Sequence, residues 1–468
     1  MDLIPKPDQV ASAASNVAHK VLYGGLADLR PMPRTLIDDG SLREVYHYRP
    51  QKQVRATGDP VLLVTPLAAP STCYDLRRDC SLVEHFVKAG RPTYLVEYGE
   101  ISFRDRNLGM EHWVDEVVPE AVRVVSEHAG GRPVHVIGWS LGGIFATLVA
   151  ADDPGLPIAS LTIVGSPFDV SQVPLVAPLR PILRLTDGGI VTRLYRMLGG
   201  APKPLVRRAF QLSSGTKLVT KPLAIMQHLD DSEWLAQIEA VDRFTANMIA
   251  YPGRTFGQLY HRMLKHNQLR AGKVDISGHQ IDLAAIRVPV LVFAGNTDGI
   301  APISAVKAVV PLLRNAREVR FEIVPGGHLG MLTGRAARRT TWVVMDEWIA
   351  QYSTPDGPAA RTPAPTTARK AAAKKAGKAP AKKASAKKTA AKRATASPAA
   401  KAPGKAATRK KTTTEATRRT RKASRSGSQG TSTGPAPTGE VAPDRAAIGS
   451  NPERRFSSGA SRGLAPKR

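Results

Sequence analysis

Three residues of this 468-residue chain have side chains that cooperate in acyl-transfer chemistry, and each lies shortly after an apolar run: Ser140, Asp298 and His328. A serine hydroxyl becomes a good nucleophile when a base accepts its proton and a third group orients that base. Ser140 lies within residues 138–143 (Gly-Trp-Ser-Leu-Gly-Gly), between the apolar run 134–137 and an apolar helical pattern. Glycines on both sides of a serine permit a sharp strand-to-helix turn that exposes the hydroxyl. We therefore predict that Ser140 is a catalytic nucleophile rather than part of a plain tight turn.

The acid and the base of such a triad are predicted from two strand candidates later in the chain. Asp298 follows the apolar run 290–293, and His328 follows the run 319–324. Each has an ordinary explanation when taken alone, because Asn-Thr-Asp-Gly is a good turn sequence and a loop histidine is often only solvated. In proteins with this strand–serine–helix turn, the nucleophile comes first along the chain, the acid second and the base third. The three residues here follow that order, and each lies just after a predicted strand. We therefore predict a triad of Ser140, Asp298 and His328.

Backbone N–H donors must face the negative charge that develops on the acyl oxygen during such a reaction. Leu141 directly follows the nucleophile and supplies the first N–H. The second is expected from the loop after the apolar run 61–64, where Pro66 has no N–H and Leu67 has one. We predict an oxyanion hole formed by the N–H groups of Leu141 and Leu67.

The elements that must position these residues alternate between strand and helix. The strand candidates are mostly continuous apolar runs, as expected for parallel strands that are covered on both faces. Their alternation with helical patterns favours a doubly wound parallel sheet. Together with the strand–serine–helix turn, it predicts an α/β class with an α/β-hydrolase fold and a mostly parallel sheet. The strand candidates are residues 61–64, 93–96, 134–137, 161–164, 290–293 and 319–324.

Composition divides the chain in two, with the boundary after residue 354. We predict an N-terminal helical extension (1–54), an α/β-hydrolase domain (55–354) and a C-terminal tail (355–468). Residues 168–280 interrupt the alternation with leucine-, proline- and arginine-rich helical patterns that lack clear strands. Because this segment is inserted between two core strands, we predict a helical cap over the carboxyl edge of the sheet. An ordinary helical layer is the alternative. The apolar residues between 175 and 185 suit a lipid-like acyl chain.

The C-terminal tail carries most of the net charge. Residues 355–468 hold 28 of the 67 basic and five of the 39 acidic residues, which is +23 of the formal net charge of +28. With one aromatic residue, the tail cannot bury enough apolar surface to offset the entropy of ordering, so we predict disorder. Its Ala-Lys-Lys repeats resemble the tails of linker histones and of some bacterial histone-like proteins. We expect it to bind DNA or another polyanion, and a solvated solubility tail is the alternative.

Other features limit the chemistry and the location. No metal-ligand spacing, phosphate-binding loop or dinucleotide motif occurs, so we predict no metal and no cofactor. Cys73 and Cys80 would lie roughly 10 Å apart on a helix, too far for a disulfide. Neither a signal peptide nor a membrane-spanning apolar stretch is apparent, so we expect a cytoplasmic protein associated with the nucleoid or with granules. Four further histidines lack a catalytic context and are expected to be structural or exposed: His135, His261, His266 and His279.

Short segments outside the triad follow an order found in one known family. They are residues 64–67, 74–76, 81–83, 97–99, 113–118, 251–253 (Tyr-Pro-Gly), 259–260, 267–269 and 281–289 (Ile-Asp-Leu-Ala-Ala-Ile-Arg-Val-Pro). In these segments, roughly residues 55–350, the chain resembles the polyhydroxyalkanoate synthases, which have the α/β-hydrolase fold. The resemblance implies that Asp298 and His328 are the family's acid and base. It also implies an acyl ester or acyl-coenzyme A substrate and contact with a lipid or polymer granule surface.

One position departs from this family. The synthases place cysteine in a Gly-x-Cys-x-Gly-Gly elbow and grow polymer on its thioester, whereas this chain has Ser140. An acyl oxoester is less reactive than a thioester towards the next transfer. We therefore expect a serine acyl hydrolase or acyltransferase, of the esterase or lipase type, that acts on hydroxyacyl or fatty acyl esters or thioesters. The alternatives are a synthase that uses serine to polymerise 3-hydroxyacyl-CoA, and a non-catalytic granule-associated protein tethered to DNA by its tail.

The basic tail yields the first testable prediction. Deleting residues 355–468 should abolish sequence-independent binding to duplex DNA, because binding of this kind depends on neutralising backbone phosphates. Binding by the full chain should also weaken steeply as salt rises from about 50 to 200 mM. Both effects can be measured by fluorescence anisotropy. Equal DNA binding by the full and shortened chains would exclude the tail as the binding segment.

Overall fold

The protein is described by a computed structural model that covers residues 6–50, 53–174, 200–212 and 215–355, with the isolated positions 176, 193 and 197. The predictions for the basic tail from residue 356 onward lie outside the described residues. So do the predictions for most of the apolar positions between 175 and 185.

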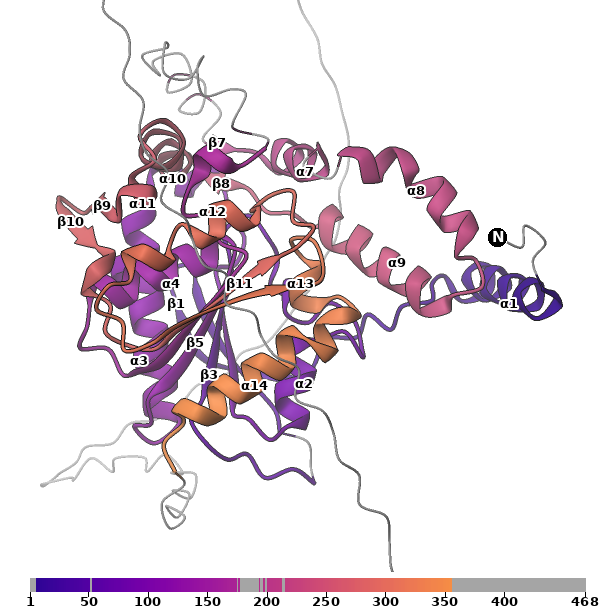
Figure 1. The fold of residues 1–468 in the computed structure, drawn as a ribbon, viewed down its shortest axis with the longest axis horizontal. Coiled ribbons are helices and arrows are strands. Elements are labelled where there is room, and N and C mark those ends of the chain that lie inside the picture. The colour runs from indigo at the N-terminus through magenta and orange to yellow at the C-terminus, as the bar shows by residue number, and fades with distance from the viewer. Residues whose placement is uncertain are drawn as a thin grey trace, which may run out of the picture. The chain divides into compact units, whose positions relative to one another are not determined.

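An eight-stranded sheet forms the centre of the described fold (Figure 1). Its order is β1-β2-β4-β3-β5-β6-β11-β12, and the six strands from β4 to β12 are parallel to one another. Each strand candidate from the sequence coincides with one of these six, which confirms the predicted fold class. The strands are β1 (Arg34–Gly40), β2 (Arg43–Tyr48), β3 (Val61–Val64), β4 (Thr93–Glu97), β5 (Val134–Trp139), β6 (Ile158–Val164), β11 (Val290–Gly295) and β12 (Val319–Val324).

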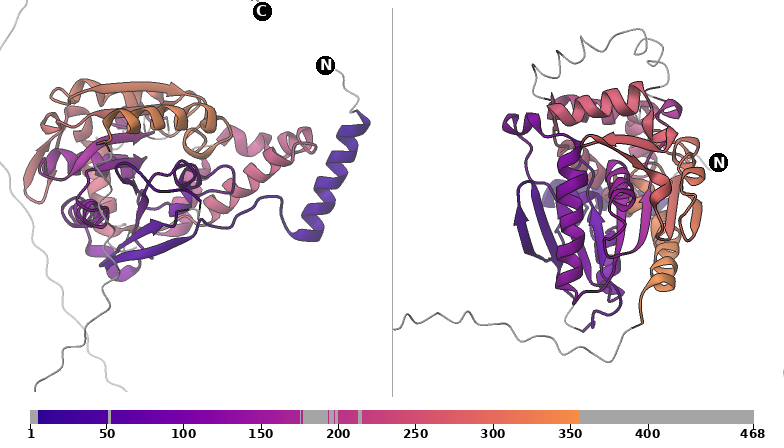
Figure 2. Two further views of the ribbon diagram at one scale, coloured as in Figure 1. Left: turned by 90° about the horizontal axis from the view of Figure 1, so that it is seen from below. Right: turned by 90° about the vertical axis from the view of Figure 1, so that its left-hand side faces the viewer.

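Helices cover both faces of the sheet, which is why its central strands are mostly apolar. In β3, Leu62 and Val64 pack into the core beneath α3 (Val118–His128) and α4 (Leu141–Asp152). Val61 and Leu63, on the opposite face, pack with α2 (Leu82–Lys88) and α14 (Thr341–Tyr352). The helices lie on opposite sides of the sheet in Figure 1, and Figure 2 gives two further views of this arrangement. Successive side chains of a strand thus pack into two separate cores on opposite faces of the sheet.

The N-terminal segment is not the wholly helical extension that we expected. Helix α1 spans Pro7–Tyr23, but β1 and β2 form a hairpin whose second strand pairs antiparallel with β4. Both strands are half-buried and carry several charged residues, so they lack the apolar runs that mark the central strands. Their pairing covers an edge of the parallel sheet that would otherwise be open.

The segment inserted between β6 and β11 is mainly helical in its described part, yet it contains strands that we did not predict. Two short antiparallel ladders pair β7 (Gly200–Ala201) with β8 (Tyr251–Pro252), and β9 (Lys273–Ile276) with β10 (His279–Asp282). Strands of two to four residues are too short for a recognisable period. The remaining α-helices of the described chain are α7 (Lys203–Leu212), α8 (Gly215–Gln227), α9 (Ser232–Ala246), α10 (Gly253–Gln258), α11 (Gln268–Ala271), α12 (Ile303–Lys307) and α13 (Gly330–Thr333).

No described helix is both long and apolar enough to cross a membrane.

His135 is buried in β5, in keeping with the structural role that we expected. Its Nε2 lies 3.0 Å from Ser353 Oγ, which itself donates to Ile349 O, so Nε2–H is the donor of that pair. Its Nδ1 lies 2.8 Å from Ser160 Oγ and accepts from that hydroxyl. Burial lowers the pKa of His135 to about 4. The folded protein therefore holds this ring neutral.

This burial predicts how stability depends on pH. Between about pH 6.5 and 4 the unfolded chain binds a proton at His135 that the folded chain does not, so stability falls as pH falls, by about 3 kcal/mol in total. His135→Gln should flatten the dependence of the thermal midpoint on pH across this window. His279→Gln is the control: because the hydrogen bond with Asp152 raises the pKa of His279, its titration affects stability above pH 6.5, so this variant should leave the slope between pH 6.5 and 4 unchanged. An unchanged slope in His135→Gln would contradict the assignment.

Candidate active site

The backbone at Ser140 forms a sharp turn between β5 and α4. Ser140 has φ 54° and ψ −124°, outside the regions that residues with a Cβ normally occupy. A Cβ at Gly142 would lie 2.3 Å from Val64 O, and one at Gly138 would lie 2.5 Å from Gly143 Cα, so neither position has room for a side chain. Glycine therefore permits the close approach of backbone segments that this turn requires.

Two hydrogen bonds hold the turn against β6. Ser140 N–H donates to Val164 O at 2.9 Å, and Ser166 Oγ donates to Ser140 O at 2.6 Å. Sequence reasoning did not identify Ser166. These bonds fix the backbone on both sides of the Ser140 side chain.

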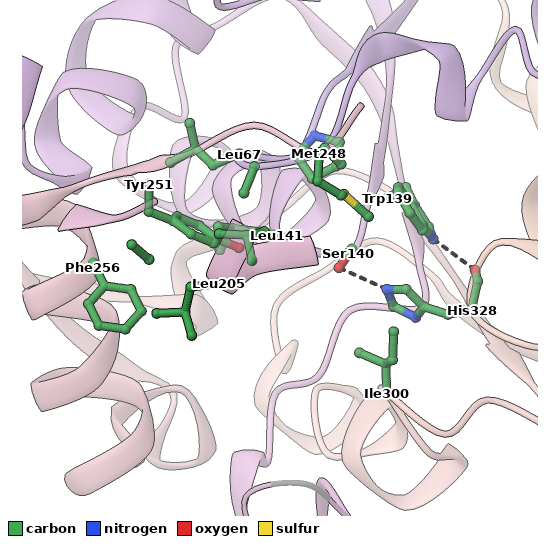
Figure 3. Close-up of a pocket in the computed structure, with 15 residues that line it drawn as sticks. Leu67, Trp139, Ser140, Leu141, Leu205, Met248, Tyr251, Phe256, Ile300 and His328 are labelled. Atoms are coloured by element: carbon green, nitrogen blue, oxygen red, sulfur yellow. Dashed lines mark hydrogen bonds between the residues drawn. The ribbon is translucent and has the colours of Figure 1, made fainter. Parts of the chain in front are cut away.

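The structure brings the three predicted triad residues together at the carboxyl edge of the sheet. His328 Nε2 lies 2.9 Å from Ser140 Oγ (Figure 3), and His328 Nδ1 lies 2.8 Å from Asp298 Oδ2. The second oxygen of Asp298 accepts from Ile300 N–H at 2.8 Å and from Ala301 N–H at 2.9 Å. With the carboxylate accepting from Nδ1–H, Nε2 is free to accept the serine proton. This is the geometry in which a serine hydroxyl is activated for attack.

Trp139, the residue before the serine, connects the turn to the histidine loop. Its Nε1–H donates to His328 O at 2.9 Å, and the two rings lie 4.9 Å apart between centroids (Figure 3). Its backbone N–H donates to Tyr74 Oη at 2.9 Å, and that hydroxyl donates to Val64 O at 2.8 Å. Burial raises the pKa of Tyr74, which remains a neutral donor. The position of Trp139 beside the nucleophile was the only signal of this role in the sequence.

Both residues predicted for the oxyanion hole lie in the wall of the cavity that contains Ser140. Leu141 is the first residue of α4, where backbone N–H groups have no acceptor within the helix. Leu67 lies in the loop after β3, as expected. Neither N–H donates to a backbone acceptor among the described residues. The two groups are therefore available to a ligand, and their function stays a prediction.

An apolar cavity of about 430 Å³ opens over Ser140 and His328 (Figure 3). Its walls come from the loop after β3, from the elbow, from α7 and from the segment that joins α9 to α10. A pocket of this size and polarity suits an acyl chain whose carbonyl reaches the serine. The residues that line it include Leu67, Ala69, Leu141, Leu205, Val206, Met248, Tyr251, Phe256 and Ile300.

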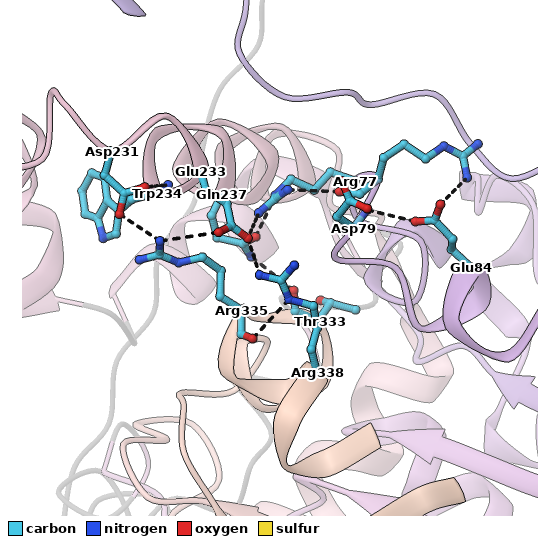
Figure 4. Close-up of polar contacts among 11 residues, drawn as sticks. Arg77, Asp79, Glu84, Asp231, Glu233, Trp234, Gln237, Thr333, Arg335 and Arg338 are labelled. Carbon is cyan, nitrogen blue, oxygen red and sulfur yellow. Dashed lines mark hydrogen bonds and ion pairs between the residues drawn. The ribbon is translucent and has the colours of Figure 1, made fainter. Parts of the chain in front are cut away.

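Helix α9 is tied by a polar network to the segment that follows His328 (Figure 4). Arg338 pairs with Glu233 at the start of α9. Arg77 Nε donates to Gln237 Oε1 at 2.9 Å, and Gln237 Nε2 donates to Thr333 O at 3.3 Å, at the end of α13. The residues near the other end of α9 contact the site, because Phe244 packs edge-on against Trp139 and Met248 lines the cavity.

Outside the triad, the described residues offer neither a reactive cysteine nor a group of side chains that could hold a metal ion. Cys73 and Cys80 are buried free thiols, and burial raises the pKa of both, which disfavours the reactive thiolate. Among the described residues, no group of three or more His, Cys, Asp or Glu side chains could hold a metal ion.

Comparison with known proteins gives the following matches. Residues 69–335 match the family described as alpha/beta hydrolase fold. The poly(3-hydroxyalkanoate) polymerase subunit PhaC of Haloferax mediterranei is 22% identical over 329 residues, which cover 65% of this chain and 62% of that protein. The subunit of the same name from Thiocystis violacea is 21% identical over 358 residues, covering 74% of this chain and 98% of that protein. A solved structure of a soluble variant of monoglyceride lipase from Saccharomyces cerevisiae aligns with a TM-score of 0.46 and 13% identity, covering 70% and 98% of the two chains.

The bond from Trp139 to His328 generates a prediction. Trp139→Phe keeps a buried ring but removes the Nε1–H donor, so turnover of a simple acyl ester should fall about five- to tenfold, the equivalent of one net hydrogen bond. The matched control is Trp342→Phe, because Trp342 Nε1–H donates to Leu332 O at 2.8 Å in the same segment without contacting His328. Steady-state kinetics and thermal midpoints check both. An equal loss of activity in the two variants would mean that Trp139 contributes only to folding.

Proposed function

The chain belongs to the α/β-hydrolase fold family, and on that premise we propose that it is a serine acyltransferase of the polyhydroxyalkanoate-synthase type. In this proposal it takes a 3-hydroxyacyl group from a thioester and transfers it to a hydroxyl acceptor. The observation that carries the proposal is the hydrogen-bonded series Ser140–His328–Asp298 beside an apolar cavity. The similar proteins are poly(3-hydroxyalkanoate) polymerase subunits, which favours this polymerase alternative over the hydrolase that the serine led us to expect.

The first half of the proposed reaction loads the enzyme. Ser140 Oγ attacks the thioester carbonyl while its proton passes to His328 Nε2, and Asp298 stabilises the resulting imidazolium. Leu141 and Leu67 are the proposed donors to the oxyanion. The carbon–sulfur bond then breaks, and the leaving thiolate takes the proton from His328. The products are an acyl-serine ester and a free thiol.

The second half determines whether the enzyme transfers or hydrolyses. An acceptor hydroxyl gives its proton to His328 as its oxygen attacks the acyl-serine, and the proton then returns to Ser140. Exchange of one oxoester for another is close to isoenergetic, whereas loss of the thioester drives the loading step forward. The apolar lining disfavours water at the acyl-serine and so supports transfer. Hydrolysis is the second candidate, favoured by Ser140 standing where the synthases have cysteine.

A non-catalytic granule tether remains the third hypothesis. The aligned triad supports an enzyme instead, because a scaffold needs neither the strained backbone at Ser140 nor its bond to His328. Labelling of the full chain by a fluorophosphonate probe would support the enzyme. A chain that reacts with neither the probe nor a thioester would support the tether.

The full chain incubated with 3-hydroxybutyryl-CoA tests the proposal. Wild type should release coenzyme A and form 3-hydroxybutyrate oligomers, and Ser140→Ala should reduce release about 10³-fold or more because the nucleophile is gone. Thiol release is followed with a disulfide reagent, and products are identified by mass spectrometry. Ser140→Cys is the matched variant, and it should raise the ratio of oligomer to free acid because the acyl thioester is more reactive.

The products separate the candidates. Free 3-hydroxybutyrate as the sole product of wild type would establish hydrolysis in place of transfer. Undiminished thiol release by Ser140→Ala would contradict both enzymatic proposals, since each passes through an acyl-serine.

A further inference from the structure

Helix α7 contributes to two neighbouring cavities. Leu205 and Val206 line the catalytic cavity. Arg207 and Arg208 line a second cavity of about 450 Å³, together with residues three and four positions away along the same helix. Met248 lines both cavities, so the second one adjoins the first. The same helix thus joins an apolar wall of the active site to a basic groove.

The basic groove has positive charge that the fold does not neutralise. Lys203 Nζ pairs with Glu100 Oε1 at 3.1 Å. Within the described residues, Arg207 and Arg208 make no ion pair, and both are exposed. Adjacent guanidinium groups repel each other, and exposed charges add little to stability in any case. A plain solvated helix face is the ordinary explanation, but these side chains line a hollow that borders the catalytic cavity.

We propose that this groove, lined by Lys203, Arg207, Arg208 and Gln211, binds the phosphate groups of an acyl-coenzyme A substrate. The guanidinium group presents parallel N–H donors that match two phosphate oxygens at once. The inference rests on the proposed function in one respect: it takes the acyl carbonyl to lie at Ser140.

The substrate and the protein each combine an apolar part with a charged part. An acyl-coenzyme A has an apolar chain, then the thioester, then a neutral arm, and finally its phosphates. In the protein, the apolar cavity contains Ser140 and shares Met248 with the groove that carries the arginines of α7. A phospholipid also joins an acyl ester to a phosphate. The experiments below therefore include it as a competing source of the same chemistry.

Binding is tested first, without turnover. Coenzyme A is titrated by calorimetry into the full chain carrying Ser140→Ala. Adding Arg207→Gln or Arg208→Gln should weaken binding about tenfold each, in the range expected for loss of a charge-assisted hydrogen bond. The control is Arg314→Gln, an exposed arginine just before β12 at the amino edge of the sheet, which should leave the Kd unchanged. The basic tail is present in every variant, so its attraction for phosphate is common to all. Equal Kd values in the four proteins would overturn the proposal.

Turnover assays and vesicle binding then distinguish coenzyme A from a phospholipid headgroup as the source of the phosphate. Arg207→Gln and Arg208→Gln are then each made in the enzyme that retains Ser140. In each variant, the ratio of the KM for 3-hydroxybutyryl-CoA to the KM for its N-acetylcysteamine thioester should rise about tenfold, because the second substrate has no phosphate. An equal rise for both substrates would indicate a structural defect and overturn the proposal. Weaker binding to phosphatidylglycerol vesicles with an unchanged Kd for coenzyme A would assign the groove to a lipid headgroup instead. If no thioester is turned over but both variants weaken coenzyme A binding, the proposed function fails while the groove assignment stands.

Discussion

The backbone turn at Ser140 is the constraint on which the rest of the site depends. Its positive φ directs the serine side chain away from β5, towards His328. Such a conformation is unfavourable for a residue with a Cβ, so the surroundings must hold it in place. They do so through glycines that admit close backbone contacts, through the bond from Ser166, and through the bond from Ser140 N–H to β6. The strain is stored at the one residue whose hydroxyl is proposed to react.

The parallel sheet explains why residues so distant in sequence meet. Ser140, Asp298 and His328 follow β5, β11 and β12, and the carboxyl ends of parallel strands share one edge. The sheet itself is specified by apolar residues on both faces, which α3 and α4 cover on one side and α2 and α14 on the other. Polar side chains at this edge therefore rest on a rigid base. Trp139 adds a direct link, since one residue packs in the core, adjoins the nucleophile and holds the histidine loop.

The inserted helices give the site its substrate-facing surface. Helix α9 is joined through Glu233 and Gln237 to the segment that follows His328, while Phe244 at its other end packs against Trp139. The same helix thus contacts both Trp139 in the cavity wall and the segment that follows His328. Transfer and hydrolysis differ only in what reaches the acyl-serine. The apolar lining therefore bears on the outcome as directly as the choice of serine over cysteine.

The sequence by itself determined the six central strands, the glycine-flanked elbow and the order of the triad. These features are local, because an apolar run, a strand-to-helix glycine turn and a polar residue at a strand end each leave a mark within a few positions. The β1–β2 hairpin was missed because its half-buried, charged strands leave no such mark. Only the tertiary structure decided that Trp139 Nε1 reaches His328 O, that Ser166 fixes the elbow, and that α7 lines both an apolar cavity and a basic groove. Those contacts join segments far apart in the chain, and no short-range pattern of residues encodes which of them will meet when the two cores pack.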